Sequence, residues 1–177
     1  RAPPLARPVL AGQTAVDTPD EPGFHIASSS AALRPQISVP PDFFCCPDCL
    51  AELAQPGNRR HRYAFINCTQ CGPRYSLIEG LPYDRPQTTM RAFRMCRTCQ
   101  REYDDPYSRR FHAQPNACPV CGPQLTLRDA TGTVTAERDA ALRAVVPLLR
   151  EGLIVAVKGL GGYHLMCDAT DETAVAT

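Results

Sequence analysis

The sequence has almost no lysine. Of its 19 basic residues 18 are arginine, and the one lysine is Lys158. Arginine presents a planar fork of donors, whereas lysine presents a compact, mobile charge. The single lysine therefore suggests that position 158 needs an ammonium group. The sign is weak, because random mutation could also leave one lysine in the sequence.

The sequence also lacks long apolar runs. No stretch of 18 apolar residues is present, so we expect no membrane-spanning helix. A basic-then-apolar leader is missing too, so we expect reduced cysteines and a cytoplasmic location. The chain starts at Arg1 rather than at methionine and stops at Thr177 within a stretch that reads as structured. We therefore expect it to be a piece of a longer polypeptide.

What the sequence has in abundance is cysteine, arranged in an internal repeat. Eight of the ten cysteines form four Cys-x-x-Cys pairs, namely Cys46/Cys49, Cys68/Cys71, Cys96/Cys99 and Cys118/Cys121. Each half of the set reads C-x2-C-x18-C-x2-C, and the second half follows the first by 50 positions. The halves also share Glu52/Glu102, Pro56/Pro106, Arg59/Arg109, Arg60/Arg110, Gly72/Gly122, Pro73/Pro123 and Leu77/Leu127. These coincidences indicate a duplicated unit.

The spacing of each half is typical of a four-thiolate zinc site. Two residues between cysteines let both sulfurs face one metal ion, and the distant pair completes a tetrahedron. Four thiolates leave no open coordination position, so we predict two structural zinc ions, one for each half. Redox-active dithiols, four disulfides and an interleaved pairing of the halves are the alternatives.

Several neighbouring residues are weaker candidates. Cys45 adjoins the first pair but lies outside the repeat, and His112 would need to displace a cysteine, so we expect neither to bind zinc. His25 stands alone and reads as an ordinary surface or strand histidine. We expect Gly72 and Gly122, each directly after a cysteine pair, to adopt positive φ in a tight turn.

Arginines mixed with aromatic residues near 59–65 and 109–112 raise the question of nucleic-acid binding. From 42 to 128 the chain has 12 arginines and 8 acidic residues. Two four-thiolate zinc centres would add about two negative charges each, which leaves the loaded module near neutral. A phosphate-binding module should show a surplus of positive charge. We expect these arginines to bond backbone carbonyls and acids such as Asp104 and Asp105.

Local patterns predict the remaining elements. We expect a short strand at 23–27, a capped helical turn over 88–93, and a hairpin of 125–128 with 133–135. A helix is expected over 137–150, kinked or restarted at Pro147. The apolar run 153–157 reads as a buried strand of an α/β sheet. It leads to Lys158 and a glycine-rich turn, which holds either a phosphate-bearing ligand or no ligand.

The sequence resembles the HypF family of carbamoyltransferases, which act in the maturation of nickel–iron hydrogenases. The resemblance rests on CPDCLAEL (46–53), FINCTQCGPRYS (65–76), LPYDR (81–85), TTM (88–90), RRFHAQP (109–115) and VKGLGGYHL (157–165). It implies a fragment with three parts. Residues 1–35 would end an acylphosphatase-like domain, 42–128 would be a tandem four-cysteine zinc-finger module, and 137–177 would begin a YrdC-like α/β domain.

The resemblance also implies an activity for the full-length protein. It would use carbamoyl phosphate and ATP, with Mg²⁺, to form carbamoyl-adenylate, and would transfer the carbamoyl group to the C-terminal cysteine of a HypE-like partner. Nucleotide-pocket positions would be Lys158, Gly161, Gly162 and Tyr163. His164 stands where the wider family has a small residue, so its role is open. The fragment alone should be inactive, because most of the catalytic domains are missing.

The sequence therefore predicts a small zinc-stabilised double module, built of tandem four-cysteine zinc knuckles, short helices and hairpins, flanked by partial α/β domains. Two rival functions remain. One is a zinc-ribbon nucleic-acid-binding protein or a YrdC-type tRNA-modifying protein, and the other is a scaffold that binds only protein.

Overall fold

The computed structural model describes residues 9–15 and 39–177. Residues 9–15 are exposed and have no regular secondary structure. The rest of the expected acylphosphatase-like tail at 1–35, the expected strand at 23–27 and His25 lie outside the described residues.

The described part contains short elements only. They are α1 (Pro47–Ala54), α2 (Arg97–Asp104), β1 (Thr126–Arg128), β2 (Val134–Glu137), α3 (Arg138–Arg150), β3 (Val155–Lys158), β4 (Tyr163–Met166), α4 (Glu172–Ala176) and 3₁₀ helices at Tyr75–Leu77, Arg85–Gln87 and Thr89–Ala92. None of these helices is long and apolar enough to cross a membrane.

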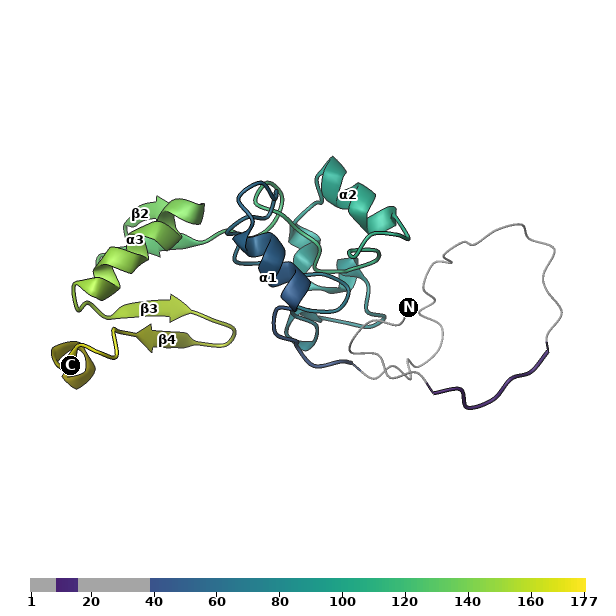
Figure 1. Cartoon of the computed structure of the whole chain (residues 1–177), viewed down its shortest axis with the longest axis horizontal. Helices are drawn as coiled ribbons and strands as arrows, with labels where there is room; N and C mark the ends of the chain where they lie inside the picture. The colour runs from purple at the N-terminus through teal and green to yellow at the C-terminus, as the bar shows by residue number, and fades with distance from the viewer. Residues whose placement is uncertain (1–8, 16–38) are drawn as a thin grey trace.

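The helices α1 and α2 occupy equivalent places in the two halves of the repeat, in the central part of the molecule (Figure 1). Each has 8 residues and begins directly after the first cysteine of its half, with Cys46 and Cys96 as the N-cap residues. Pro47 at the first helical position suits this start, because its missing N–H would have no partner there anyway. Each helix therefore presents its two cysteines from one turn.

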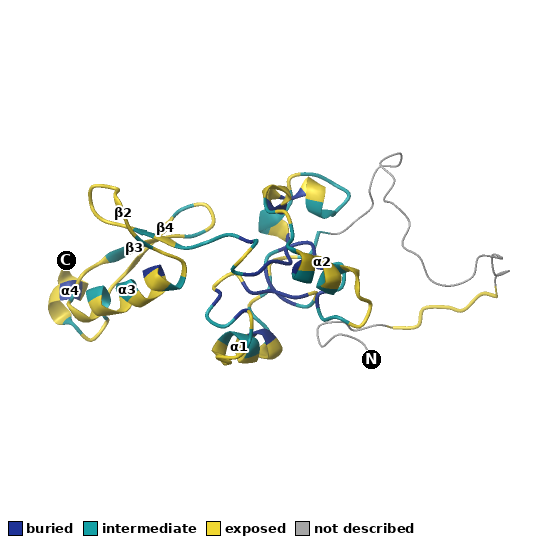
Figure 2. Ribbon diagram, turned by 90° about the horizontal axis from the view of Figure 1, so that it is seen from above, coloured by how far each residue is buried: buried dark blue, intermediate teal, exposed yellow. Residues whose placement is uncertain are grey.

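Most of the buried residues in the described part of the chain gather in this central part, between α1 and α2 (Figure 2). The core of this part is unusual because it contains few large apolar side chains. The fully buried side chains with the largest volumes are Arg60, Asn116 and Thr88, followed by Pro115 and five of the cysteines. Sulfur and hydrogen-bonded polar groups thus occupy the space that aliphatic side chains fill in an ordinary core.

The expected capped turn over 88–93 is confirmed as a 3₁₀ helix at Thr89–Ala92. The hydroxyl of Thr88 accepts a hydrogen bond from the Met90 backbone N–H at 3.2 Å. This capping bond satisfies one of the free N–H groups at the helix start. Met90 is buried, and Phe93 packs beside it in the same cluster.

The C-terminal part begins with the expected hairpin. Strands β1 and β2 pair in antiparallel register, with Leu127 opposite Ala136. The helix α3 follows at once and runs unbroken from Arg138 to Arg150. The predicted restart at Pro147 is therefore wrong, and the predicted kink stays a prediction. The proline lies in the last turn, so the backbone hydrogen bond that it removes is near the helix end.

The strand expected at 153–157 is present, but the prediction that it is buried is wrong. The strand is β3, which pairs in antiparallel register with β4, Val155 opposite Met166 and Lys158 opposite Tyr163. Most residues of this two-stranded sheet are exposed (Figure 2). A two-stranded sheet has no second layer of strands to cover it, and the single helix α3 contacts it from one side. The apolar run therefore forms a strand, and both faces of this strand are partly exposed to solvent.

Candidate metal centres

The structure gathers the eight cysteines of the repeat into two groups of four. One group is Cys46, Cys49, Cys68 and Cys71, and the other is Cys96, Cys99, Cys118 and Cys121. Within each group all four sulfur atoms lie within 4.8 Å of one another. Each half of the repeat thus forms its own group, as its spacing predicts, and the groups are not interleaved.

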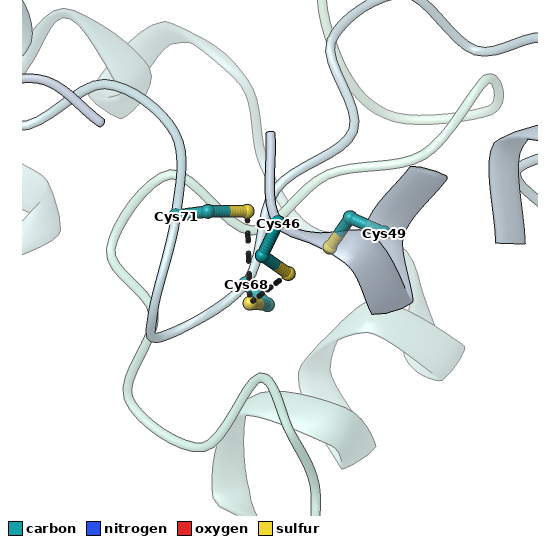
Figure 3. A group of neighbouring side chains, drawn as sticks. All are labelled: Cys46, Cys49, Cys68 and Cys71. Carbon is teal, nitrogen blue, oxygen red and sulfur yellow. Dashed lines mark hydrogen bonds between the residues drawn. The ribbon is translucent and has the colours of Figure 1, made fainter. Parts of the chain in front are cut away.

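The distances between the sulfur atoms fit a tetrahedral metal ion. A tetrahedron with Zn–S bonds of about 2.3 Å has sulfurs about 3.8 Å apart. In the first group Cys46 and Cys68 are separated by 3.8 Å, and Cys68 and Cys71 by 3.7 Å (Figure 3). In the second group the Cys118 sulfur lies 3.9 Å from that of Cys96 and 3.7 Å from that of Cys121. Disulfide-bonded sulfurs would be about 2.05 Å apart, so the geometry favours zinc over disulfides.

The two cysteine turns use glycine in different ways. Gly72 has φ 99°, as expected, and a Cβ atom there would also lie 2.6 Å from the Asn67 Cβ. Gly122 does not have positive φ, so that part of the expectation is wrong. The reason for glycine is close packing, because a Cβ atom at this position would lie 2.2 Å from the Tyr63 hydroxyl and 2.5 Å from the Ala117 Cβ.

Neither extra candidate ligand joins a group. Cys45 is half-buried beside the first group but is not one of its four members. The imidazole of His112 instead stacks on Tyr103, with ring centroids 4.6 Å apart, and meets Phe111 edge-on. With four sulfurs in each group and no fifth donor among the described residues, the groups suit a structural metal ion rather than a catalytic one.

Arginines of each half reach the sulfur atoms of the other half. Arg59, from the first half, donates to Cys96 at 3.5 Å and to Cys99 at 3.4 Å. Arg109, at the equivalent position of the second half, donates to Cys46 at 3.6 Å and to Cys49 at 3.1 Å. A four-thiolate zinc centre carries two negative charges, and the guanidinium groups offset part of that charge.

The next arginine of each half likewise contacts the opposite half, where its partner is a glutamate. Arg60 donates to Glu102 at 2.5 Å and to the Ala117 carbonyl at 2.8 Å. Arg110 donates to Glu52 at 2.5 Å, and its Nε donates to the Asn67 carbonyl at 3.0 Å. The two halves are thus joined by a reciprocal set of charged contacts, the arrangement expected of an approximate two-fold interface.

These contacts correct part of the sequence interpretation. The arginines do bond carbonyl groups near the cysteine turns, as expected. Their main acidic partners, however, are Glu52 and Glu102 and not Asp104 or Asp105. Asp48 also lies near Arg109, and Asp139 pairs with Arg62. The sequence does contain a signal for these glutamates, because the glutamates and the arginine pairs recur at the same positions of the two halves, 50 residues apart. What the sequence could not show is that each arginine serves the opposite half.

Charge neighbours shift the pKa values of these groups. Burial raises the pKa of Glu52, but the hydrogen bonds and charges of Arg110 and Arg109 outweigh it and hold this pKa below its ordinary value. Among the thiols, a hydrogen bond from Cys49 lowers the pKa of Cys68, and the same contact raises the pKa of Cys49. Because zinc binds thiolates, loading of the group must release the protons that the other cysteines hold.

The four candidate nucleotide-pocket residues lie elsewhere, at the exposed turn between β3 and β4. The Lys158 ammonium lies over the Tyr163 ring, 5.2 Å from its centroid. Gly161 has φ 80°, and the Gly159 N–H donates to the Gly162 carbonyl at 2.8 Å to close the turn. The structure therefore brings Lys158 and Tyr163 together, with the glycines beside them.

Comparisons with known protein families match both parts of the described chain. A family model described as the HypF finger matches residues 45–78 and again 95–128. A second model, for the Sua5/YciO/YrdC family with the description telomere recombination, matches residues 147–177. The duplicated unit of the sequence is thus two copies of one known finger.

Individual relatives agree with these matches. The chain is 52% identical over 99% of its length to carbamoyltransferase HypF from Rhodobacter capsulatus, covering 23% of that protein. It is 59% identical over 78% of its length to carbamoyltransferase HypF from Synechocystis sp., covering 18% of it. A crystal structure of full-length HypF in the phosphate- and nucleotide-bound form superposes with a TM-score of 0.67 at 50% identity, over 78% of this chain and 18% of that one. The chain therefore spans about a fifth of the length of these relatives.

Proposed function

The chain belongs to the HypF family, and we propose that it is the zinc-binding segment of a carbamoyltransferase together with the start of its YrdC-like domain. The observation that carries the proposal is the pair of four-cysteine groups within a segment 52% identical to a HypF carbamoyltransferase. All eight cysteines of the groups act as zinc ligands in this proposal. The zinc ions are structural, and the chemistry belongs to parts of the full-length protein that flank the module.

The proposed reaction of the full-length protein starts from carbamoyl phosphate. Water cleaves it to phosphate and carbamate, and the carbamate attacks the α-phosphorus of ATP, held with Mg²⁺, which gives carbamoyl-adenylate and pyrophosphate. The carbamoyl group then passes to the C-terminal cysteine thiol of a HypE-like maturation protein, with release of AMP and the thiol proton. The nucleotide-bound HypF crystal structure supports the nucleotide part of this proposal by similarity. Free thiols that bind zinc need a reducing compartment, so we place the reaction in the cytoplasm.

The zinc module has a mechanical role in this proposal. Carbamate is short-lived in water, so the site that releases it and the site that adenylates it must keep a fixed relation. The reciprocal arginine contacts join the two halves of the module between residues 42 and 128. We propose that it separates the flanking domains at a constant distance, with 1–35 closing the acylphosphatase-like domain and 137–177 opening the YrdC-like one.

Lys158 gives the most specific test of the proposal. Its mobile ammonium at an exposed glycine turn is suited to a phosphate or carbamoyl oxygen of the adenylate. In the full-length protein, Lys158→Ala should lower carbamate-dependent ATP–pyrophosphate exchange by roughly 10²-fold, the scale of one preorganised electrostatic contact. Arg150→Gln, which removes an exposed positive charge of the same segment, is the control and should exchange normally.

The zinc content of Lys158→Ala should equal that of the unaltered protein, because the lysine lies outside both cysteine groups. Near-normal exchange by Lys158→Ala would show that Lys158 serves only the turn. It would contradict the proposal that this segment contributes to the nucleotide pocket.

A further inference from the structure

Three arginines of the zinc module have no partner among the residues that the structure describes. They are Arg94, Arg97 and Arg101. The other nine of the 12 arginines between 42 and 128 all donate to a thiol, a carboxylate or a carbonyl group, and they are Arg59, Arg60, Arg62, Arg74, Arg85, Arg91, Arg109, Arg110 and Arg128. The unpaired cations of the module are therefore confined to one place.

The three arginines line a single open hollow of about 650 Å³ at the start of α2, with Met95 and Gln100 between them. All three are exposed. Arg97 and Arg101 are one helical turn apart on α2, so their side chains are neighbours on its surface. Like charges at this spacing repel each other, and an anion seated between them would remove that repulsion.

The two acids on α2 do not neutralise the cluster, because Glu102 is paired with Arg60 and Asp104 is bonded to a neutral side chain. Both carboxylate oxygens of Asp104 accept hydrogen bonds from the Gln100 side-chain amide, at 3.0 and 3.1 Å. The arginines of the hollow thus remain free to receive an anion from outside the described part of the chain.

The first half of the repeat provides an internal control. Positions 50 residues earlier hold Phe44, Pro47 and Ala51, which carry no charge. Helix α1 has the same length as α2, begins at the same point of its half and presents an equivalent cysteine group. The metal site and the helix therefore do not need arginines at these positions, and the cations serve something other than the fold.

We propose that Arg94, Arg97 and Arg101 form a docking surface for an acidic, carboxylate-rich peptide segment of a partner protein. Arginine forks pair with carboxylates through two parallel hydrogen bonds. The hollow is open, whereas sites for small phosphorylated ligands enclose most of the ligand. Nucleic acid fits less well, because Met95 and Gln100 offer no ring for a base to stack on. This inference does not depend on the proposed carbamoyl transfer.

The test uses the zinc-loaded chain and a short fluorescein-labelled peptide of alternating glutamate and serine, with binding followed by fluorescence anisotropy. The peptide should bind, and its affinity should fall as sodium chloride is added. The triple variant Arg94→Gln, Arg97→Gln, Arg101→Gln should bind about tenfold more weakly, the combined effect of several exposed ion pairs. Its zinc content should be unchanged, which shows that the module is still folded.

The matched control is the triple variant Arg128→Gln, Arg143→Gln, Arg150→Gln, which removes the same charge from exposed positions outside the hollow. It should bind the peptide nearly as well as the unaltered chain. Equal losses in the two triple variants would mean that only overall charge matters, and would overturn the proposal. No binding of the glutamate peptide, or its ready displacement by inorganic phosphate or a DNA duplex, would overturn it as well.

Discussion

At the residue scale, the buried arginines decide whether the two halves of the module stay together. Arg60 is only 1% exposed, and it contacts Glu102, the Ala117 carbonyl and the Asn116 side chain. All of these partners lie in the second half of the repeat, although Arg60 belongs to the first. A buried charge network of this kind stabilises only while every member is present.

Removal of Arg60 should therefore destabilise the module strongly. We expect Arg60→Ala to lower the free energy of unfolding by about 3 to 5 kcal/mol, because Glu102 would lose its buried partner. Arg91→Ala breaks an exposed ion pair with Glu79 and should cost no more than about 1 kcal/mol. Urea denaturation of both zinc-loaded variants measures the difference, and equal midpoints would show that the network contributes little.

Gly122 offers a second test at this scale. Gly122→Ala would drive a methyl group into the Tyr63 hydroxyl and Ala117, and would disturb the hydrogen bond from Tyr63 to the Pro123 carbonyl. Overpacking of this kind costs about 1 to 3 kcal/mol. Gly57→Ala meets nothing within 4 Å and is the control. Thermal unfolding should separate the two variants clearly, and a Gly122→Ala protein as stable as Gly57→Ala would refute the packing argument.

The sequence predicted the cysteine groups but not the contacts around them. The repeat favours one group of four sulfurs for each half over an interleaved pairing, and the structure confirms this grouping. The arginine exchange depends on how the halves pack, and a repeat does not say whether Arg109 faces its own cysteines or those of the first half. The sequence correctly indicates that position 122 needs glycine, but the predicted reason, positive φ, is wrong. Close packing also selects glycine, and it is the reason here.

At the element scale, the exchange of arginines links each zinc site to the opposite half. Arg109 follows α2 in the chain but contacts Cys46 and Cys49 beside α1. A residue that hydrogen-bonds a metal ligand typically changes metal affinity by about 10- to 100-fold when it is removed. The site affected by an Arg109 variant should therefore be the first one and not the second.

Cadmium NMR of the cadmium-substituted chain can test this, because each four-thiolate site gives its own resonance. During titration with a chelator, Arg109→Gln should lose the resonance of the first site early, by about 10-fold or more in chelator concentration, and keep the second. Arg59→Gln should show the reverse order, which makes the two variants controls for each other. Loss of the site in the same half as the altered arginine would contradict the exchange.

Element boundaries were predicted where a local signal existed. The hairpin of β1 and β2 and the capped turn at Thr89–Ala92 follow from turn and capping residues. The prediction that the strand at 153–157 is buried failed for a different reason. An apolar run shows that a strand can be buried, but it does not show which elements cover it. The continuous helix α3 shows that a proline in the last turn need not divide a helix.

At the scale of the whole molecule, charge distribution is more informative than net charge. The composition suggested a near-neutral module and argued against nucleic-acid binding. The structure adds that most of its arginines are committed to internal partners, whereas the remaining three share one surface at α2. A count of charges could not have located that surface, because it depends on which arginines find partners.

The central claim is that each half of the repeat holds one structural zinc ion. Metal analysis of the purified chain should give two zinc ions per chain, and the variant Cys46→Ala, Cys49→Ala should retain one. The variant Cys96→Ala, Cys99→Ala should likewise retain one, because each group of four thiols is complete within its own half. One zinc per unaltered chain, or an unchanged content in either variant, would contradict the account.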